Sequence, residues 1–277
     1  MTLSELLPIL AIHLYALGSV SVVVGILARR NWLKRTGLWL TVVAFMGHTI
    51  LLGTTLWGSG PEGLPRSAYM LLLAWCITLS GLVAWIRYRY ETLLLVVAPV
   101  ALLAFLAALL LRHADVPLPA SLSGMTFSIH IGAIFISIGL MALSFGAGLL
   151  FLFQERTIKS KSRPAGFQRD LPALSSLDRI NAVTTTLGFP LFSIGILFGF
   201  VSARLSWGTL LSGDPKELVS LVVWGLYAWL FHQRFAQGRQ GRRPAQLAVA
   251  VFLFCVLSLV VVNLVLPSHH NFLTIPS

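Results

Sequence analysis

Charged residues are scarce in this chain: Asp, Glu, Lys and Arg make up only 10% of its 277 residues. Soluble domains carry roughly 25% charged residues, so this scarcity excludes an ordinary soluble fold. Hydrophobic residues make up 57% of the chain, and the mean hydropathy is +0.86. The longest polar stretch, residues 155–181, is too short to fold as a domain of its own. The sequence therefore predicts an integral membrane protein and not a soluble catalyst with a membrane anchor.

Cysteine is also nearly absent. The two cysteines, Cys76 and Cys255, lie within apolar segments, and the sequence holds no C-x-x-C pair. A thiol-redox motif and a c-type haem attachment site are therefore excluded. The H-E-x-x-H pattern of zinc proteases is missing as well, which removes support for that class of enzyme. We interpret both cysteines as small packing residues.

Acidic side chains are few, 9 against 20 Lys and Arg, so the formal net charge is +11. A basic protein can bind nucleic acid through contacts with phosphate. Here the cations fall in clusters between apolar segments, as the positive-inside rule requires of a membrane protein. The charge therefore indicates membrane topology, and we expect a lipid bilayer and no nucleic acid as a partner.

Apolar segments long enough to cross a bilayer, which takes about 20 helical residues, are abundant. The expected spans are residues 5–28, 37–58, 67–86, 92–112, 126–153, 182–203, 217–235 and 245–266. No segment alternates with period two, which argues against a β-barrel. No Lys or Arg precedes the first segment, as it would in a cleaved signal peptide, so we keep it as a span. The predicted fold class is all-α, a polytopic membrane protein with about eight transmembrane helices.

The distribution of cations predicts the orientation of these helices. All but four of the 20 Lys and Arg residues lie in the connectors after the first, third, fifth and seventh spans. The exceptions are Arg66, Arg112, Arg204 and Lys216. Because cytoplasmic loops carry the excess of Lys and Arg, we expect these four basic connectors in the cytoplasm. Both termini then lie outside.

Histidines are the ionisable residues that point to chemistry, because ionisable groups within a membrane are costly and mark functional sites. His130 lies just inside the outer end of the fifth span, and His269 and His270 follow the eighth span on the same side. His13 and His48 lie deeper, roughly 12 and 15 Å from the outer ends of their spans at ~1.5 Å per residue. A neutral imidazole can ligate haem iron, or it can simply form a hydrogen bond between helices. Position alone leaves both interpretations open.

The outer loop between the sixth and seventh spans is the second informative place. It runs from Trp207 to Glu217. Asp214 is a suitable N-cap for the following helix, with Pro215 as its first residue and Glu217 as its third. This structural explanation does not account for Trp207 and Gly208, although tryptophan favours the membrane interface.

Small residues recur in the sixth span. Gly195 and Gly199 stand four residues apart. This spacing suits close contact between two transmembrane helices. We interpret the pair as a packing feature.

Seven short motifs, in order along residues 120–275, together resemble the cytochrome c assembly family of haem-handling membrane proteins, the CcsA, ResC, CcmC and HemX relatives. The motifs are Ile129-His130-Ile131, Leu177-Asp178-Arg179-Ile180, Gly188-Phe189-Pro190, Trp207-Gly208 with Asp214-Pro215-Lys216-Glu217, Leu230-Phe231-His232-Gln233-Arg234, Gly241-Arg242-Arg243, and Asn263 with His270-Asn271-Phe272. The first four spans resemble those of the short, eight-span members in topology only. We therefore expect a variable N-terminal four-helix half over residues 1–118 and a cytochrome c assembly half over residues 119–277.

In that family a tryptophan-rich outer loop, the WWD domain, holds haem against the membrane surface. The resemblance makes the outer loop of this chain a WWD-like loop, with Trp207 and Asp214 as its signature residues. Where family members carry two further tryptophans, this chain has Leu211 and Gly213. Two alternatives follow from the resemblance: the haem platform is degraded, or Phe or Trp residues elsewhere, such as Trp57, complete it.

Two outer histidines flanking the loop supply the iron ligands in that family. The resemblance implies that His130 and His270 ligate the iron of haem b in this chain. His269, next to His270, is an alternative for the second ligand. The resemblance also makes His13 and His48, at similar depth, a candidate intramembrane pair that passes haem outward.

The resemblance implies a haem-binding component of cytochrome c maturation in the bacterial cytoplasmic (inner) membrane, with the WWD-like loop on its outer, periplasmic face. Such a protein presents haem to apocytochrome c beside a second maturation subunit, and is at most part of a synthase-type complex. An alternative is a non-catalytic, HemX-like protein that affects haem biosynthesis or haem levels, which the missing tryptophans favour. An unrelated transporter would have internal repeats, and the two halves share none.

Overall fold

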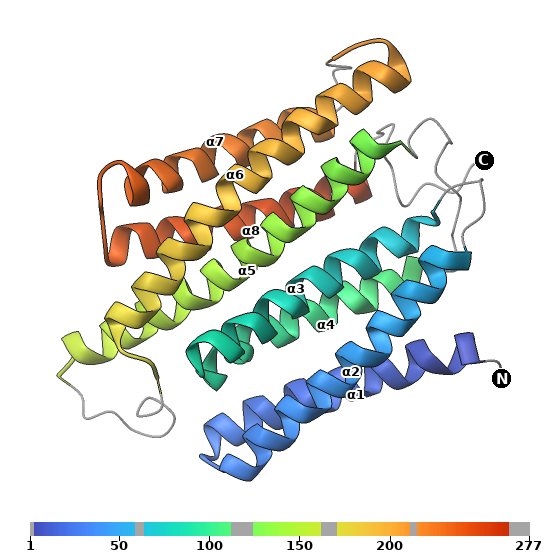
Figure 1. The fold of residues 1–277 in the computed structure, drawn as a ribbon. Helices are drawn as coiled ribbons and strands as arrows, with labels where there is room; N and C mark the ends of the chain where they lie inside the picture. The colour runs from blue at the N-terminus through green and yellow to red at the C-terminus, as the bar shows by residue number, and fades with distance from the viewer. Residues whose placement is uncertain (1–2, 59–63, 112–123, 162–170, 211–214, 266–277) are drawn as a thin grey trace.

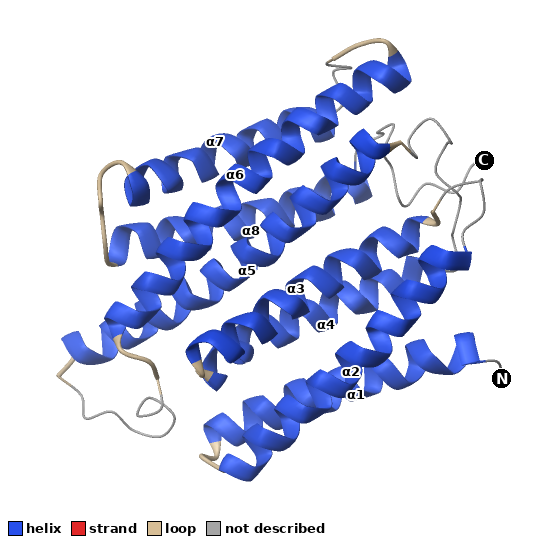
Figure 2. Cartoon of the chain, in the orientation of Figure 1, coloured by secondary structure: helices blue, strands red, loops and turns tan. Residues whose placement is uncertain are grey.

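The computed structural model describes residues 3–58, 64–111, 124–161, 171–210 and 215–265. The described residues form eight α-helices and one 3₁₀ turn, and they contain no strand (Figure 2). The elements are α1 (Leu3–Leu27), α2 (Asn31–Gly58), α3 (Arg66–Tyr88), η1 (Glu91–Leu93), α4 (Leu94–Leu111), α5 (Met125–Lys159), α6 (Leu174–Trp207), α7 (Pro215–Phe235) and α8 (Arg242–Val265). The all-α fold class predicted from the sequence is confirmed.

Seven of the helices in the described part of the chain are long and apolar enough to cross a membrane. The exception is α7, whose 21 residues include charged or polar groups at both ends, such as Glu217 and Arg234. This helix packs against α6 through aromatic side chains. The ring centroid of Phe189 lies 5.9 Å from that of Trp224 and 4.8 Å from that of Phe231. The chain is a multi-pass helical membrane protein in which α7 is the least apolar member.

The helices α5 and α6, with 35 and 34 residues, are longer than the spans expected from hydropathy. The extra turns include charged and polar residues with hydrogen-bond partners. On α5, Lys159 Nζ donates to Glu155 Oε1 at 2.7 Å. Hydropathy detects only the part of a helix that lies in hydrocarbon, whereas the backbone hydrogen bonds continue beyond it.

The helices alternate in direction, so the bundle has two ends (Figure 1). We call the end with the connectors after α1, α3, α5 and α7 the basic end. Its described cations are Arg29, Arg30, Lys34, Arg35, Arg87, Arg89, Arg156, Lys159, Lys161, Arg179, Arg234, Arg239, Arg242 and Arg243. At the opposite end, α5 and α7 begin and α6 and α8 end.

The helix α5 lies at the centre of the bundle, in contact with α3, α6 and α8 (Figure 1). Every residue from Met141 to Gly148 is buried. The largest cluster of buried apolar side chains joins α5 to α3, α4, α6, α7 and α8, and two smaller clusters lie among α1–α4. Large apolar side chains such as Trp39 and Leu197 are exposed on the outside, as a helix surface in lipid requires. Residues on α5 are therefore held by neighbours on several sides.

Candidate functional site

His130 lies in the second turn of α5, at the end of the bundle opposite the basic end. Its Nδ1 atom lies 2.7 Å from the carbonyl oxygen of Gly195 on α6. A carbonyl oxygen only accepts hydrogen bonds, so Nδ1 carries the proton of the neutral imidazole and donates it. The lone pair of the ring then lies on Nε2. A metal-ligating histidine commonly has this tautomer, with one nitrogen donating to a backbone carbonyl and the lone pair on the other.

Two glycines of α6 make room for this part of α5, Gly199 for the imidazole and Gly195 for Ile134. A Cβ atom on Gly199 would lie 2.8 Å from His130 Nδ1, and one on Gly195 would lie 2.6 Å from Ile134 Cγ1. A larger residue at either position would force α5 and α6 apart. Phe127 packs near the ring, with 6.0 Å between the two centroids. The close helix contact predicted from the glycine pair is confirmed.

The WWD-like loop lies only partly within the described residues. The helix α6 ends at Trp207, and Gly208 follows with a φ of 76° and its N–H 3.0 Å from the carbonyl oxygen of Arg204. Glycine adopts this left-handed conformation at no steric cost and often ends a helix in this way. Helix termination therefore accounts for Gly208, which the sequence had left unexplained. The helix α7 begins at Pro215 as predicted, whereas Asp214 lies outside the described residues.

His269 and His270 also lie outside the described residues. The helix α8 ends at Val265, at the same end of the bundle as His130 and the C-terminus of α6 (Figure 1). The pairing of His130 with His270 stays a prediction. Trp57, named as a further aromatic residue, lies near the end of α2 and is 93% exposed.

His48 is completely buried and forms hydrogen bonds through both ring nitrogens. Its Nε2 lies 3.1 Å from the carbonyl oxygen of Leu71 on α3, so Nε2 is the donor. Its Nδ1 then accepts from the hydroxyl of Tyr15 on α1 at 3.2 Å. The ring also meets Phe105 of α4 edge-on, with 4.7 Å between centroids. One imidazole thus joins four helices, and it would have to break one of its two hydrogen bonds to ligate iron.

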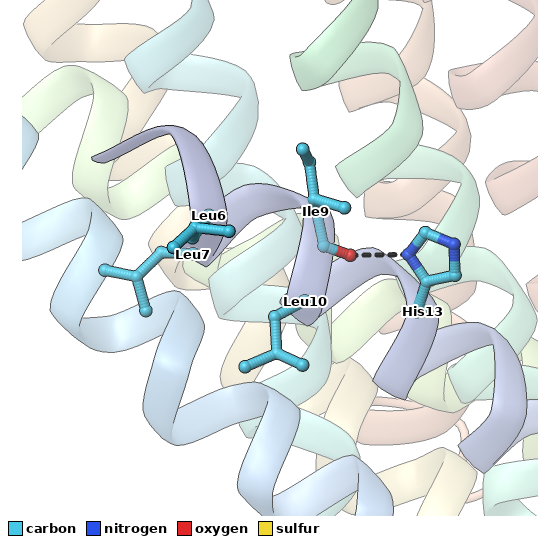
Figure 3. A pocket seen from close by; sticks show the side chains of 5 residues that line it. All are labelled: Leu6, Leu7, Ile9, Leu10 and His13. Carbon is cyan, nitrogen blue, oxygen red and sulfur yellow. Dashed lines mark hydrogen bonds between the residues drawn. The ribbon is translucent and has the colours of Figure 1, made fainter. Parts of the chain in front are cut away.

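His13 has different surroundings. Its ring is exposed on α1, and Nδ1 lies 2.6 Å from the carbonyl oxygen of Ile9 in the same helix. Figure 3 shows this bond among the side chains that line a pocket. The pocket is an open apolar hollow of about 410 Å³. The hollow is lined by Leu6, Leu7, Ile9, Leu10 and His13. The haem-transfer pair of His13 and His48 stays a prediction. His13, like His130, donates from Nδ1 to a backbone carbonyl, whereas His48 would have to give up one of its hydrogen bonds.

A buried polar cluster at the basic end was not predicted from the sequence. Arg234 Nη1 lies 2.8 Å from Asp178 Oδ1, and the two side chains are only 2% and 11% exposed. Arg234 Nε donates to Asn181 Oδ1 at 2.9 Å, and the N–H of Gly241 donates to Asp178 Oδ1 at 2.8 Å. We call these four residues the Arg234 cluster. Asp178, Arg234 and Gly241 each belong to one of the seven sequence motifs. The motifs therefore marked these residues, but only the fold shows that the residues contact one another.

Other donor groups do not form a metal centre within the described ranges. No three His, Cys, Asp or Glu residues lie together there. Cys76 and Cys255 are buried thiols, 5% and 4% exposed. Their interpretation as packing residues is confirmed.

The family model and the relatives in the comparison with known proteins are all cytochrome c assembly or biogenesis proteins. The family described as "Cytochrome C assembly protein" matches residues 64–270. The "Cytochrome c biogenesis protein CcsA" of Gloeothece citriformis (strain PCC 7424) is 28% identical in an alignment of 250 residues that covers 73% of this chain and 76% of the relative. The CcsA protein of Prochlorococcus marinus (strain MIT 9303) is 31% identical over 232 residues, with 73% of each chain covered.

A solved structure has the same arrangement of helices. The "Cytochrome c Heme Lyase CcmF" superposes with a TM-score of 0.68 at 15% sequence identity. The match covers 95% of this chain and 50% of that one, so this chain spans half the length of that protein. At this level of identity the likeness shows the fold alone.

Proposed function

We propose that this chain, which belongs to the cytochrome c assembly protein family, binds haem b at the end of the bundle opposite the basic end and presents it to apocytochrome c. The observation that carries the proposal is the 2.7 Å hydrogen bond from His130 Nδ1 to the Gly195 carbonyl. This bond fixes the neutral tautomer in which Nε2 has the lone pair that an iron ligand needs. When bound, haem supplies the porphyrin whose vinyl groups are joined to cysteine thiols of the apocytochrome.

The proposed ligand set is His130 with His270, and His269 is the alternative to His270. The ends of α6 and α8 support this set, because both lie at the same end of the bundle as the start of α5. Trp207 and Asp214 belong to the loop proposed to lie against the porphyrin. The role of these residues is to hold and orient haem.

The proposed orientation has the basic end in the cytoplasm and the haem site on the outer, periplasmic face of the bacterial cytoplasmic membrane. It is supported by the clustering of Lys and Arg at one end of the bundle, because basic loops stay on the cytoplasmic side. Attachment of haem requires the thiols of the apocytochrome. We propose that a second maturation subunit in the membrane takes part as well.

Deletion of the chain from its own cells tests the proposed function. We expect the deletion strain to lose covalently bound haem in c-type cytochromes and to keep its haem b, measured by haem staining of denatured membrane proteins and by reduced-minus-oxidised spectra. The wild-type chain is expected to restore haem attachment, and His130→Ala is not. His232→Ala is the matched control, because His232 is exposed at the basic end. Unchanged covalent haem in the deletion strain would contradict the proposal.

A second candidate function is a non-catalytic, HemX-like role in haem biosynthesis or haem levels. The observation in its favour is that Leu211 and Gly213 stand where family members have tryptophans. In that case the deletion would change haem b and covalent haem together, or cause haem precursors to accumulate. The same strain therefore distinguishes the two functions.

A further inference from the structure

Three hydrogen-bonded pairs join α5 to α6 at intervals of seven residues on both helices. The pairs are His130–Gly195 at 2.7 Å, Ser137–Gly188 at 2.8 Å and Ser144–Asn181 at 2.9 Å. In the first two, a side chain of α5 donates to a backbone carbonyl of α6. In the third, the Asn181 amide donates to the Ser144 hydroxyl. We call these three pairs the α5–α6 ladder.

The seven-residue interval has a geometric meaning. A straight α-helix has 3.6 residues per turn, so the same face returns every seven residues only when two helices wrap around each other with a left-handed twist. At about 1.5 Å per residue, successive pairs of the ladder lie about 10 Å apart along the helices. Ser137, Ser144 and Asn181 are each at most 1% exposed. The ladder is therefore one continuous buried contact line that ends at His130.

Glycine on α6 permits close packing at two pairs of the ladder, against α5 at Gly195 and against α7 at Gly188. A Cβ atom on Gly195 would lie 3.1 Å from the backbone nitrogen of Ile134, and one on Gly188 would overlap the hydroxyl of Tyr227. Without a Cβ at Gly195, α5 approaches closely enough for the His130 side chain to reach the Gly195 carbonyl. Small residues at a helix interface permit such close approach. The register of α5 on α6 is therefore specified at particular residues and not by general apolar contact.

The Ser144–Asn181 pair, at the basic end of the ladder, connects the ladder to the Arg234 cluster. Asn181 uses its Nδ2 for Ser144 and its Oδ1 to accept from Arg234 Nε at 2.9 Å. Arg234 in turn pairs with Asp178, which also accepts the N–H of Gly241. The N-terminal part of α6 is thereby attached to α7 and to the residue just before α8. This attachment opposes sliding of α6 along α5.

We infer that Ser137 and Asn181 are positioning residues for His130. The ladder holds α5 and α6 in one register, and so it sets the depth and rotation at which His130 Nε2 meets its ligand. A slip of one helical turn would move His130 by about 5.4 Å, remove the ring from Gly199 and break all three pairs together. This inference rests on the proposed function, because the ligand of His130 is taken to be haem iron.

Displacement of the histidine ligand by cyanide tests this role in the full-length, haem-loaded chain. We expect Ser137→Ala to lower the cyanide concentration that half-converts the Soret band by about three- to fifteen-fold, the factor that corresponds to one interhelical hydrogen bond. Ser202→Ala is the matched control, because Ser202 is 5% exposed and its hydroxyl donates to Phe198 within α6. The control is expected to behave like the wild type. Asn181→Ser, at the other end of the ladder, is the second variant and is expected to behave like Ser137→Ala.

The tautomer of His130 gives a readout that does not need haem. In the haem-free chain labelled with ¹⁵N-histidine, the His130 signals are identified by their loss in His130→Ala. We expect the Nδ1-protonated form in the wild type and in Ser202→Ala. In Ser137→Ala and Asn181→Ser we expect a mixture of tautomers, because the register that brings Nδ1 to the Gly195 carbonyl is weakened.

The outcomes separate the two proposals. If the ladder variants match Ser202→Ala in both cyanide displacement and tautomer, the positioning role is overturned. If the wild type binds no haem, the proposed function fails, and the tautomer measurement alone decides the ladder. In that case a tautomer change confined to the ladder variants would support the register role, and its absence would overturn that role as well.

Discussion

Among single residues, the hydrogen bonds of each imidazole indicate which ring nitrogen carries the proton. His130 donates from Nδ1 to a backbone carbonyl, and its lone pair lies on Nε2. His48 uses both nitrogens within the bundle. The sequence placed both histidines in apolar segments, where either role was open. The difference arises from groups on other helices, Gly195 for one ring and Tyr15 and Leu71 for the other.

Substitution of His48 tests its structural role. His48→Leu would leave the Tyr15 hydroxyl without its acceptor, and we expect it to lower the free energy of unfolding by about 2 kcal/mol. His48→Gln retains a donor and an acceptor and is expected to recover most of that loss. Unfolding in mixed detergent micelles gives the measurement. Loss of bound haem in both His13→Ala and His48→Gln, with the fold retained, would instead support the intramembrane pair.

The Arg234 cluster predicts an unequal effect of two ion-pair substitutions. Arg234→Ala would leave the carboxylate of Asp178 buried without its cation, and we expect a loss of about 3–5 kcal/mol in unfolding free energy. Lys159→Ala is the control, because Lys159 is 62% exposed in its pair with Glu155. The control is expected to cost about 0.5 kcal/mol or less. Equal losses of unfolding free energy in the two variants would show that the buried pair stabilises the fold no more than the exposed pair does.

Between elements, the packing of α5 against α6 predicts different responses to alanine at two glycines. Gly195→Ala would bring a Cβ within 2.6 Å of Ile134 Cγ1, and we expect a loss of about 1–3 kcal/mol from this overpacking. Gly132→Ala on α5 meets nothing within 4 Å, so it is expected to be neutral or to gain up to about 1 kcal/mol in helix propensity. Thermal unfolding in detergent compares them. A Gly195→Ala variant as stable as Gly132→Ala would contradict the close packing.

The elements themselves were largely predictable from hydropathy and end signals. The structure confirms helices at all eight expected places, the start of α7 at Pro215 and the close contact at Gly195 and Gly199. The extra turns of α5 and α6 were missed because charged and polar residues such as Glu155 and Asp178 interrupt the apolar pattern there, whereas the helices continue. The α5–α6 ladder was missed for a different reason. A seven-residue spacing on one helix acquires meaning only once the partner helix and its register are known.

For the whole molecule, the distribution of cations predicts which end is accessible from outside the cell. A membrane-impermeant maleimide applied to intact cells is expected to label Thr209→Cys and not Gln240→Cys, because Thr209 lies opposite the basic end and Gln240 lies at it. Both positions are exposed, and the native Cys76 and Cys255 are buried, so background labelling is expected to be low. Permeabilised cells should label both variants. The reverse pattern in intact cells would invert the proposed topology.

The family match extends across most of the bundle. It begins at residue 64, just before α3, and the largest apolar cluster likewise joins α3 and α4 to α5–α8. The sequence motifs pointed only to residues 120–275, because α4 is almost uniformly apolar and no motif was identified in α3. The division into halves at residue 118 stays a prediction, and α1 and α2 are the helices before the matched region.

The absorption spectrum of the purified full-length chain tests the central claim most directly. The wild type from haem-replete membranes is expected to have a Soret band that weakens in both His130→Ala and His270→Ala, and that is unchanged in the control His232→Ala. That result would establish haem held by two histidines opposite the basic end. Intact protein without a Soret band in the wild type, or an equal band in all four samples, would contradict the proposed haem site.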